Sequence, residues 1–540
     1  MRTALLATLA TCLALPQAAG AARYAVGAAS VEDLPQLERA LGGGVESLAP
    51  LPALIVERPT APRPGKLPGA TYVERLGARR LAFTPNDPLA QKHQWHLAAN
   101  RAFDYWPDLP ILPRVLVAVI DSGIDGGHPE FEGRIADWKS FVGTSALQDT
   151  QGHGTFVAGV IAATVNNEIG IAGMAPAVDL LIAKVVAADG TIDIEAEARA
   201  IRWAVETGAR VLNMSLGGLR DPRNEALDTF SPLEAAAIAY ARERGVVVVA
   251  AVGNGDSAPT QPWPYATYPA ALPHVLGVSA LGRTGSSPVF SNRDKIYNDI
   301  AAPGQGIVST LPRTLTVPFK ECPDQGYSIC GADDWRAAEG TSFAAPQVAA
   351  AAAMLIAERP NIRSEQVTTL LTGTAVDAKA ATGCLQCPPR RDELTGWGRL
   401  DMEAALLQLG ARLPPRDLLE PNDDAGPLAA RLWGQTKRIA ATLDFWDDQN
   451  DVYAIKLRRK QPVFVSVRGP AGTDTNLILW KPGARRIDDL GRLDRVARQS
   501  ARTGPREWLS YRAPKAGWYF VQVKLGSRGS GRYRLAIVKG

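Results

Sequence analysis

Alternating strand and helix patterns over residues 114–280 constrain the fold of this chain more than any other feature. The strand-like runs are rich in β-branched residues, as in RVLVAVI, VDLLIAKVV and VVVVAAVGN, and stretches such as IEAEARAIRWAVETG between them have helical spacing. Continuous apolar strands between helices indicate a parallel sheet that is covered by helices on both faces. Ligands of such sheets bind beyond the carboxyl ends of the strands, so we expect functional residues there.

Three short strings place reactive side chains at the ends of such elements. Asp121 ends the strand run VAVIDSG, His153 precedes a helical run in GHGTFVAG, and Ser342 precedes another in GTSFAAP. A hydroxyl group is a poor nucleophile until a base removes its proton, and the base needs an anion to orient it. These strings and the chain order Asp, His, Ser resemble the subtilisin family of serine endopeptidases over roughly residues 86–410.

The resemblance implies a role for each side chain in peptide-bond hydrolysis. Ser342 would attack the carbonyl carbon, His153 would take the hydroxyl proton, and Asp121 would orient the imidazole. Asn254, at the end of VVVVAAVGN, would donate to the oxyanion together with the Ser342 amide. Its other interpretation is a turn-forming residue ahead of Gly255. No redox or organic cofactor is implied, and the expected partners are polypeptide substrates.

Two other functions compete with this one. A catalytically silent protease fold could act as a binding protein, but the complete set of reactive residues argues against it. An esterase could use the same chemistry, but G-x-S-x-G is absent around Ser342 and the chain order is not that of an α/β-hydrolase.

Two further segments would line the pocket for the residue that precedes the scissile bond. By resemblance, these positions are Ser215, Leu216, Gly217, Ala250, Ala251, Val252 and Gly253. Small residues at a strand edge let an extended peptide add to the sheet through backbone hydrogen bonds. Neither segment carries a charge, so we expect a preference for apolar or broadly tolerated side chains.

The loop VNNEIGI, which follows the helix after His153, resembles the calcium loop of the family. The oxygen ligands of this structural ion would come from Glu130, Val165, Asn167, Ile169 and Ile171. Oxygen is the ligand that a hard cation requires. Glu130 stands where the family usually has aspartate, and one extra residue precedes the loop. The alternative interpretation is an ordinary polar loop.

The N-terminal segments predict export and maturation. Residues 1–22 combine Arg2, a short apolar run and a small-residue end, as in a secretory signal peptide, although a buried core helix has a similar pattern. The longest later apolar run, at 348–357, is shorter than the about 20 residues of a membrane span. Residues 23–85 predict a strand, a helix and two strands, and resemble the inhibitory propeptide of the family; an ordinary N-terminal domain is the alternative. We therefore expect a secreted, soluble, monomeric enzyme that matures from a zymogen.

Four cysteines would remain after removal of the signal peptide, an even number that suits two disulfides in an oxidising compartment. Cys322, Cys330, Cys384 and Cys387 allow three pairings, and the local pairing, Cys322–Cys330 with Cys384–Cys387, closes the shortest loops. A zinc site is the competing interpretation, because CLQC has metal-ligand spacing. The other two cysteines are not arranged as CxxC, which favours disulfides.

The peptidase-like region, 86–412, is followed by a linker at 413–427 that is rich in Pro, Gly and Asp. Residues 428–540 contain short alternating runs with turn residues between them, which predict a β-sandwich. The succession EPNDD, DVYAIKL, AGWYFVQV and YRLAIV resembles the pre-peptidase C-terminal domain of secreted proteases. The net charge of +4 on 540 residues, without a basic run interleaved with aromatics, predicts no polyanion partner and no nucleic acid.

Overall fold

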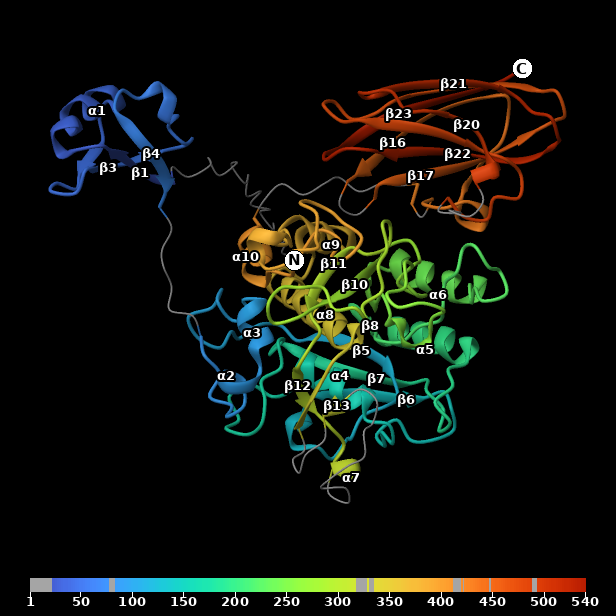
Figure 1. The fold of residues 1–540 in the computed structure, drawn as a ribbon, viewed down its shortest axis with the longest axis horizontal. Helices are drawn as coiled ribbons and strands as arrows, with labels where there is room; N and C mark the ends of the chain where they lie inside the picture. The colour runs from blue at the N-terminus through green and yellow to red at the C-terminus, as the bar shows by residue number, and fades with distance from the viewer. Residues whose placement is uncertain are drawn as a thin grey trace, which may run out of the picture. The chain divides into compact units, whose positions relative to one another are not determined.

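The computed structural model divides the chain into two compact units, Met1–Arg80 and Leu81–Gly540 (Figure 1). The described residues are 22–76, 83–316, 328–329, 335–410, 419–420, 422–445, 448–487 and 493–540. The predicted signal peptide, apart from Ala22, lies outside them, as do Cys322 and Cys330. Within the described ranges, none of the helices combines the length and apolar character that crossing a membrane requires.

The first unit has a small α+β fold, as its sequence pattern predicts. Its antiparallel sheet has the order β2-β3-β1-β4. The elements are β1 (Ala22–Ala28), α1 (Leu34–Leu41), β2 (Val45–Ser47), β3 (Ala53–Arg58) and β4 (Ala70–Arg75). Leu37 of the helix is buried with Val26 and Leu54 of the sheet, so α1 and the strands share one core. Only the short strand β2 was not expected from the sequence.

A seven-stranded sheet forms the centre of the second unit, in the order β11-β10-β9-β8-β5-β7-β6. Its strands are β5 (Val115–Asp121), β6 (Ile135–Ser140), β7 (Val178–Lys184), β8 (Val211–Met214), β9 (Val247–Ala251), β10 (Val275–Leu281) and β11 (Ile300–Pro303). Each pair of neighbouring strands runs parallel. The parallel sheet that the β-branched runs predict is confirmed.

Helices cover both faces of this sheet, because successive residues of a strand point to opposite sides. On one side, α4 (His153–Ala162) and α8 (Thr341–Glu358) share a core with alternate strand residues such as Val119. On the other side, α5 (Ile194–Thr207) and α6 (Pro232–Glu243) pack with their neighbours such as Ile120. The smaller elements are α2 (Ala90–His93), α3 (Trp95–Ala99), β12 (Ile307–Thr310), α7 (Arg313–Thr316), β13 (Ser328–Ile329), β14 (Trp335–Ala338), α9 (Ser364–Gly373) and α10 (Met402–Leu407).

The C-terminal residues form the predicted β-sandwich, whose two sheets have the orders β15-β17-β22-β19-β20 and β16-β23-β18-β21. The strands are β15 (Ala430–Leu432), β16 (Thr436–Asp444), β17 (Asn450–Leu457), β18 (Pro462–Arg468), β19 (Thr475–Trp480), β20 (Val496–Ser500), β21 (Arg506–Arg512), β22 (Gly517–Leu525) and β23 (Ser530–Lys539). Their inward side chains, including Val465 and Val521, make one core between the sheets. The alternation of apolar and polar residues along each strand accounts for this arrangement.

Candidate active site

The three strings meet where β5 ends and where α4 and α8 begin. Asp121 is the last residue of β5, His153 is the first residue of α4, and Ser342 is the second residue of α8. A Cβ atom at Gly154 would lie 2.2 Å from the carbonyl oxygen of Gly123. Glycine at that position is therefore what lets α4 start against the end of β5. Glycine in these strings thus allows two backbone segments to lie close together.

Asp121 and His153 are in direct contact. The Nδ1 atom of His153 lies 2.8 Å from Oδ1 and 3.0 Å from Oδ2 of Asp121. Asp121 is 1% exposed, and the backbone amide of Ser122 also donates to its Oδ1 atom, at 2.7 Å. A buried carboxylate is costly unless it accepts hydrogen bonds, and here it accepts from both groups. This contact leaves Nε2 as the imidazole nitrogen that can accept a proton.

The electrostatic surroundings favour the protonated form of His153. Burial lowers the pKa of its imidazole, but the charge and hydrogen bond of Asp121, together with the charge of Asp149, outweigh burial, and the net pKa is raised. An imidazole in this setting accepts a proton readily and its cation is stabilised. Both properties suit a general base.

Ser342 is held at the start of α8 by two hydrogen bonds with the end of β8. Its hydroxyl donates to the carbonyl oxygen of Ser215 at 3.1 Å, and the Ser215 hydroxyl donates to the carbonyl oxygen of Ser342 at 2.8 Å. The ring of the next residue, Phe343, has its centroid 5.6 Å from that of His153. The start of α8 therefore lies against the imidazole, and its amides and positive dipole end are available to an anion.

Asn254 has its side-chain amide fixed in one orientation. Its Oδ1 atom accepts from the backbone amide and from the hydroxyl of Thr341, both at 3.0 Å. Because a backbone amide can only donate, the oxygen must face Thr341, and the Nδ2 donor faces away. A Cβ atom on Gly340 would come within 3.2 Å of Nδ2. The residue also precedes a 3-10 turn, but its side chain makes no capping hydrogen bond there.

Asp149 is a site residue that the sequence analysis missed. Its Oδ1 atom accepts from the Ser122 hydroxyl at 2.9 Å and from the Gly152 amide at 2.8 Å. Its Oδ2 atom accepts from the amide of Thr155 at 2.9 Å. Asp149 thus caps the start of α4 and ties it to the end of β5. A carboxylate four residues before a histidine that opens a helix was the available signal.

The predicted substrate segments differ in their exposure. Ala250 and Val252 are fully buried in the core beside α5 and α6. Ala251 is 3% exposed and belongs to the core beside α4 and α8. Of that run, only Gly253 is not buried. In the other segment Ser215 is buried, Leu216 is partly exposed and Gly217 is exposed. A peptide can therefore reach these segments mainly through Leu216, Gly217 and Gly253.

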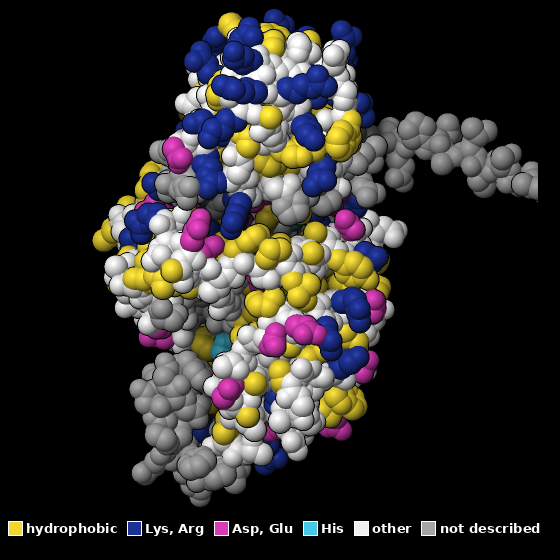
Figure 2. All heavy atoms as spheres, turned by 90° about the vertical axis from the view of Figure 1, so that its right-hand side faces the viewer, with side chains coloured by type: hydrophobic (Ala, Val, Ile, Leu, Met, Phe, Trp, Pro, Cys, Tyr) yellow, Lys and Arg dark blue, Asp and Glu magenta, His cyan; other side chains and the backbone are white. Residues whose placement is uncertain are grey.

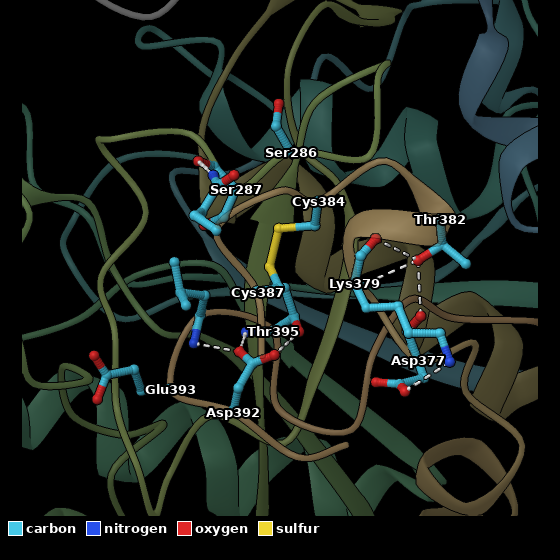
Figure 3. Close-up of a disulfide and its surroundings, with 12 residues drawn as sticks. Ser286, Ser287, Asp377, Lys379, Thr382, Cys384, Cys387, Asp392, Glu393 and Thr395 are labelled. Atoms are coloured by element: carbon cyan, nitrogen blue, oxygen red, sulfur yellow. Dashed lines mark hydrogen bonds and ion pairs between the residues drawn. A yellow bond between two sulfur atoms is a disulfide. The ribbon is translucent and has the colours of Figure 1, made fainter. Parts of the chain in front are cut away.

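Cys384 and Cys387 form a disulfide, one of the two bridges in the predicted local pairing (Figure 3). The carboxylate of Asp392 lies nearby and accepts from the amide and the hydroxyl of Thr395, as the same view shows. This pairing removes two of the four thiolates that the alternative zinc site would need.

The predicted calcium ligands are oxygen atoms, and N–H groups donate to those of Glu130 and Asn167 in this structure. Glu130 is fully buried and accepts from the Ile171 amide at 2.8 Å and from Asn167 Nδ2 at 3.0 Å. The carbonyl oxygens of Val165, Ile169 and Ile171 accept no hydrogen bond from any described residue. Three unengaged carbonyls beside a carboxylate are ligands that a hard cation can use.

A second carboxylate, which the sequence analysis did not include, lies against the same loop. Asp87 accepts from the backbone amides of Asn166 and Asn167, at 3.0 and 3.2 Å. Burial raises the pKa of Glu130 to about 7, and the negative charge of Asp87 adds to that rise. A bound cation would offset the negative charges of both carboxylates, and the oxygen donors of this loop suit calcium.

Two other groups of side chains could share a cation, and they consist of His274, Glu420 and Asp423, and of Glu420, Asp448 and Asp451. The first is an ion-pair network, because His274 Nε2 and Arg242 Nη2 lie 3.1 and 3.3 Å from Glu420 Oε2. The second contains carboxylates alone and is the better match to a hard cation.

Comparison with known proteins finds a matching family and several relatives. The model of the subtilase family matches residues 113–398. Thermitase of Thermoactinomyces vulgaris is 32% identical over 299 residues, which cover 54% of this chain and 94% of thermitase. Subtilisin E of Bacillus subtilis (strain 168) is 36% identical over 264 residues, which cover 48% of this chain and 60% of subtilisin E. A solved structure described as a lanthipeptide protease has a TM-score of 0.47 and 22% identity, and covers 61% of this chain and 99% of its own.

These matches identify the chain as a serine endopeptidase. The family model spans more than half of its length, so the chain belongs to the subtilase family. The resemblance that the three strings predict is thereby confirmed.

Proposed function

We propose that Ser342, His153 and Asp121 are the catalytic triad of this endopeptidase. The observation that carries the assignment is the contact of His153 Nδ1 with Asp121 at 2.8 Å. With Nδ1–H held by the carboxylate, the imidazole is in the tautomer whose Nε2 can accept the Ser342 proton. The hydroxyl of Ser342, which donates to Ser215 in the free enzyme, turns to Nε2 when substrate is bound, because catalytic hydrogen bonds often align only in the complex.

The reaction then has two halves. Ser342 Oγ bonds to the substrate carbonyl carbon as its proton passes to His153, and collapse of the tetrahedral intermediate breaks the peptide bond while His153 gives the proton to the leaving amine. Water hydrolyses the acyl-enzyme by the same proton transfers. Asp121 keeps its charge throughout and stabilises the imidazolium.

Asn254 supplies a donor to the oxyanion of both tetrahedral intermediates. Thr341 holds the amide by its oxygen, so Nδ2 needs no reorganisation when negative charge develops. Donors that are fixed before the reaction stabilise the transition state most. The backbone amide of Ser342, at the start of α8, is the second donor.

Labelling with a fluorophosphonate probe tests the triad. The probe reacts with an activated serine, so the wild-type chain should be labelled at Ser342 and the Ser342→Ala variant should not. An unlabelled wild type that is folded would favour a catalytically silent protein. Labelling that persists in Ser342→Ala would move the nucleophile to another residue.

The segments of the sequence support proposals on export, maturation and substrate preference. We infer a secreted enzyme with a signal peptide at 1–22, an inhibitory propeptide at 23–85 and a peptidase domain at 86–412. The linker at 413–427 and the β-sandwich at 428–540 complete the chain. The segments 215–217 and 250–253 contain no charged residue, which supports apolar or broadly tolerated side chains before the scissile bond. Cleavage-site profiling of a peptide library tests that preference, which a strong requirement for a charged residue would contradict.

We also infer that the loop at 165–171 holds calcium as a structural ion. Glu130, Asn167 and the carbonyls of Val165, Ile169 and Ile171 would bind it, with Asp87 as a further carboxylate. The ion would neutralise the buried carboxylates and take no part in the chemical steps.

A further inference from the structure

The β-sandwich and the rest of the chain have charges of opposite sign. Residues 428–540 contain 23 Lys and Arg against 9 Asp and Glu, a formal charge of +14. The whole chain carries +4, so residues 1–427 carry −10. Figure 2 shows Lys and Arg side chains spread over the β-sandwich, with few acidic side chains among them. The small net charge of the chain therefore conceals a strongly basic region.

Much of this charge lies on one sheet, β16-β23-β18-β21. We define the arginine face as five exposed arginines of this sheet, Arg438, Arg468, Arg506, Arg532 and Arg534. Arg512 of β21 is also exposed, but its guanidinium donates to the carbonyl oxygen of Lys460 and is not included. No exposed residue of these four strands is acidic. None of the five guanidinium groups forms an ion pair or hydrogen bond with another described residue. The face thus presents donors that nothing in the described part of the chain occupies.

The register of the sheet lines up three of these arginines. Arg468 of β18 is directly opposite Arg534 of β23 on one side and Arg506 of β21 on the other. Neighbouring strands lie about 4.7–4.9 Å apart, and like charges directly opposite each other destabilise a sheet. Repulsion between the three arginines therefore destabilises the protein without ligand, and an anion that bridges them would relieve it.

An aromatic shelf borders the row. Phe464 and Trp508 are 43% and 50% exposed, and their rings are stacked with centroids 6.3 Å apart and planes at 27°. The two side chains and the arginines at 438, 468, 506 and 534 line a hollow of about 560 Å³. Flat rings stack against the apolar face of another ring system, and arginine forms paired hydrogen bonds with carboxylate or sulfate groups.

We propose that the arginine face binds an acidic polysaccharide, a chain of sugar rings that carry carboxylate or sulfate groups. The arginine row matches anions that recur closely along a polymer, and the aromatic shelf offers a platform for a sugar ring. Single-stranded nucleic acid is less well matched, because it uses successive stacking positions and this face has a single shelf. An anionic membrane is less well matched, because the apolar side chains line a hollow instead of protruding for insertion. The proposal is independent of the triad assignment.

The test measures binding of the full-length Ser342→Ala chain, which avoids self-digestion, to dextran sulfate, polygalacturonate and neutral dextran by titration calorimetry. Binding to both anionic polymers, falling with added salt, and none to dextran are the expected results. The triple variant Arg468→Ser/Arg506→Ser/Arg534→Ser should weaken binding by about tenfold or more. The same arginines changed to Lys keep the charge but lose the paired hydrogen bonds, and should give an intermediate loss.

Matched controls separate the face from general basicity. Lys456→Ser/Arg498→Ser/Lys515→Ser removes the same charge from exposed positions outside this sheet and should change affinity by less than about threefold. Trp508→Ala should weaken binding to polygalacturonate, whereas Trp433→Ala, which removes an exposed tryptophan elsewhere on the β-sandwich, should not.

Three outcomes would overturn the proposal. Equal losses in Arg468→Ser/Arg506→Ser/Arg534→Ser and in Lys456→Ser/Arg498→Ser/Lys515→Ser would mean that only net charge matters. Tighter binding to single-stranded DNA, or to phosphatidylglycerol vesicles, that depends on the same arginines would assign the face to that class of partner. If the chain is folded by its melting curve but binds neither anionic polymer at low salt, an acidic polysaccharide is excluded as the ligand.

Discussion

The candidate active site and the arginine face place charge in opposite ways. In the site, Asp121 is 1% exposed and each of its oxygens lies within hydrogen-bond distance of a donor from its own chain. On the face, Arg534, Arg468 and Arg506 stand side by side in solvent without a counter-ion among the described residues. Burial makes an unpaired charge costly, whereas water tolerates one at the expense of mild repulsion. The charge of Asp121 in the candidate site is thus partnered within the fold, whereas the arginine face leaves its charges to solvent and to the ligand that we propose.

The largest expected effect is on the fixed donor of the site. Asn254→Ala should lower kcat by about 10²–10³-fold with little change in KM, because the lost hydrogen bond forms only in the transition state; this magnitude is the one found for subtilisin. Steady-state kinetics on a peptide substrate measures it. Asn224→Ala, in an exposed turn, is the matched control and should leave both constants unchanged. An equal loss of kcat in both variants would contradict the role of Asn254 as a donor to the oxyanion.

Calcium removal should have the next largest effect, on stability. A ligand that binds only the folded state stabilises it by about 2.7 kcal/mol when present at 100 times its Kd. We therefore expect a chelator to lower the melting temperature of the Ser342→Ala chain, and Glu130→Gln to reduce that response. A melting temperature that is the same with calcium and with chelator would show that the loop at 165–171 needs no ion.

The pH dependence of catalysis should reveal the charges around His153. Because His153 must be neutral to accept a proton and its pKa is raised, kcat/KM should rise with pH and reach half its maximum above the ordinary histidine value of about 6.5. Asp149→Asn removes one of the charges that raise this pKa, so the rise should move to lower pH. The exposed Asp137→Asn is the control. An Asp149→Asn profile that coincides with the wild type would leave Asp149 as a helix cap alone.

The smallest expected effect is on the arginine face itself. Arg468→Ser/Arg506→Ser/Arg534→Ser should leave kcat/KM for a small peptide within about twofold of the wild type, because solvent and salt screen charges that are exposed on the β-sandwich. Its melting temperature should stay equal or rise slightly, since each relieved like-charge pair is worth about 0.2–1 kcal/mol. A marked fall in melting temperature would mean that these arginines serve the fold.

Local sequence singles out the candidate catalytic residues, because each lies in a short string that contains glycine. Position 154 must be glycine because it lies close to the backbone of Gly123. For this reason Asp121 and His153 lie in short sequence strings that are easy to recognise. Asp149 and Asp87 were not predicted, because their partners are backbone amides that only the folded chain brings to them. The substrate segment at 250–253 was predicted by resemblance, but burial leaves only Gly253 accessible.

What the sequence determined by itself is the periodicity of each element and the identity of the reactive strings, since both depend on residues close together in the chain. The tertiary structure alone decided which way the Asn254 amide faces, because Thr341 is 87 residues away. It also decided the arginine row, because strand register sets residues from β18, β21 and β23 opposite one another. The whole-chain charge of +4 predicted no polyanion partner because a sum over the sequence averages two regions of opposite sign. The net charge of a chain does not say where its charges lie, whereas Coulomb interactions depend on the distances between charges.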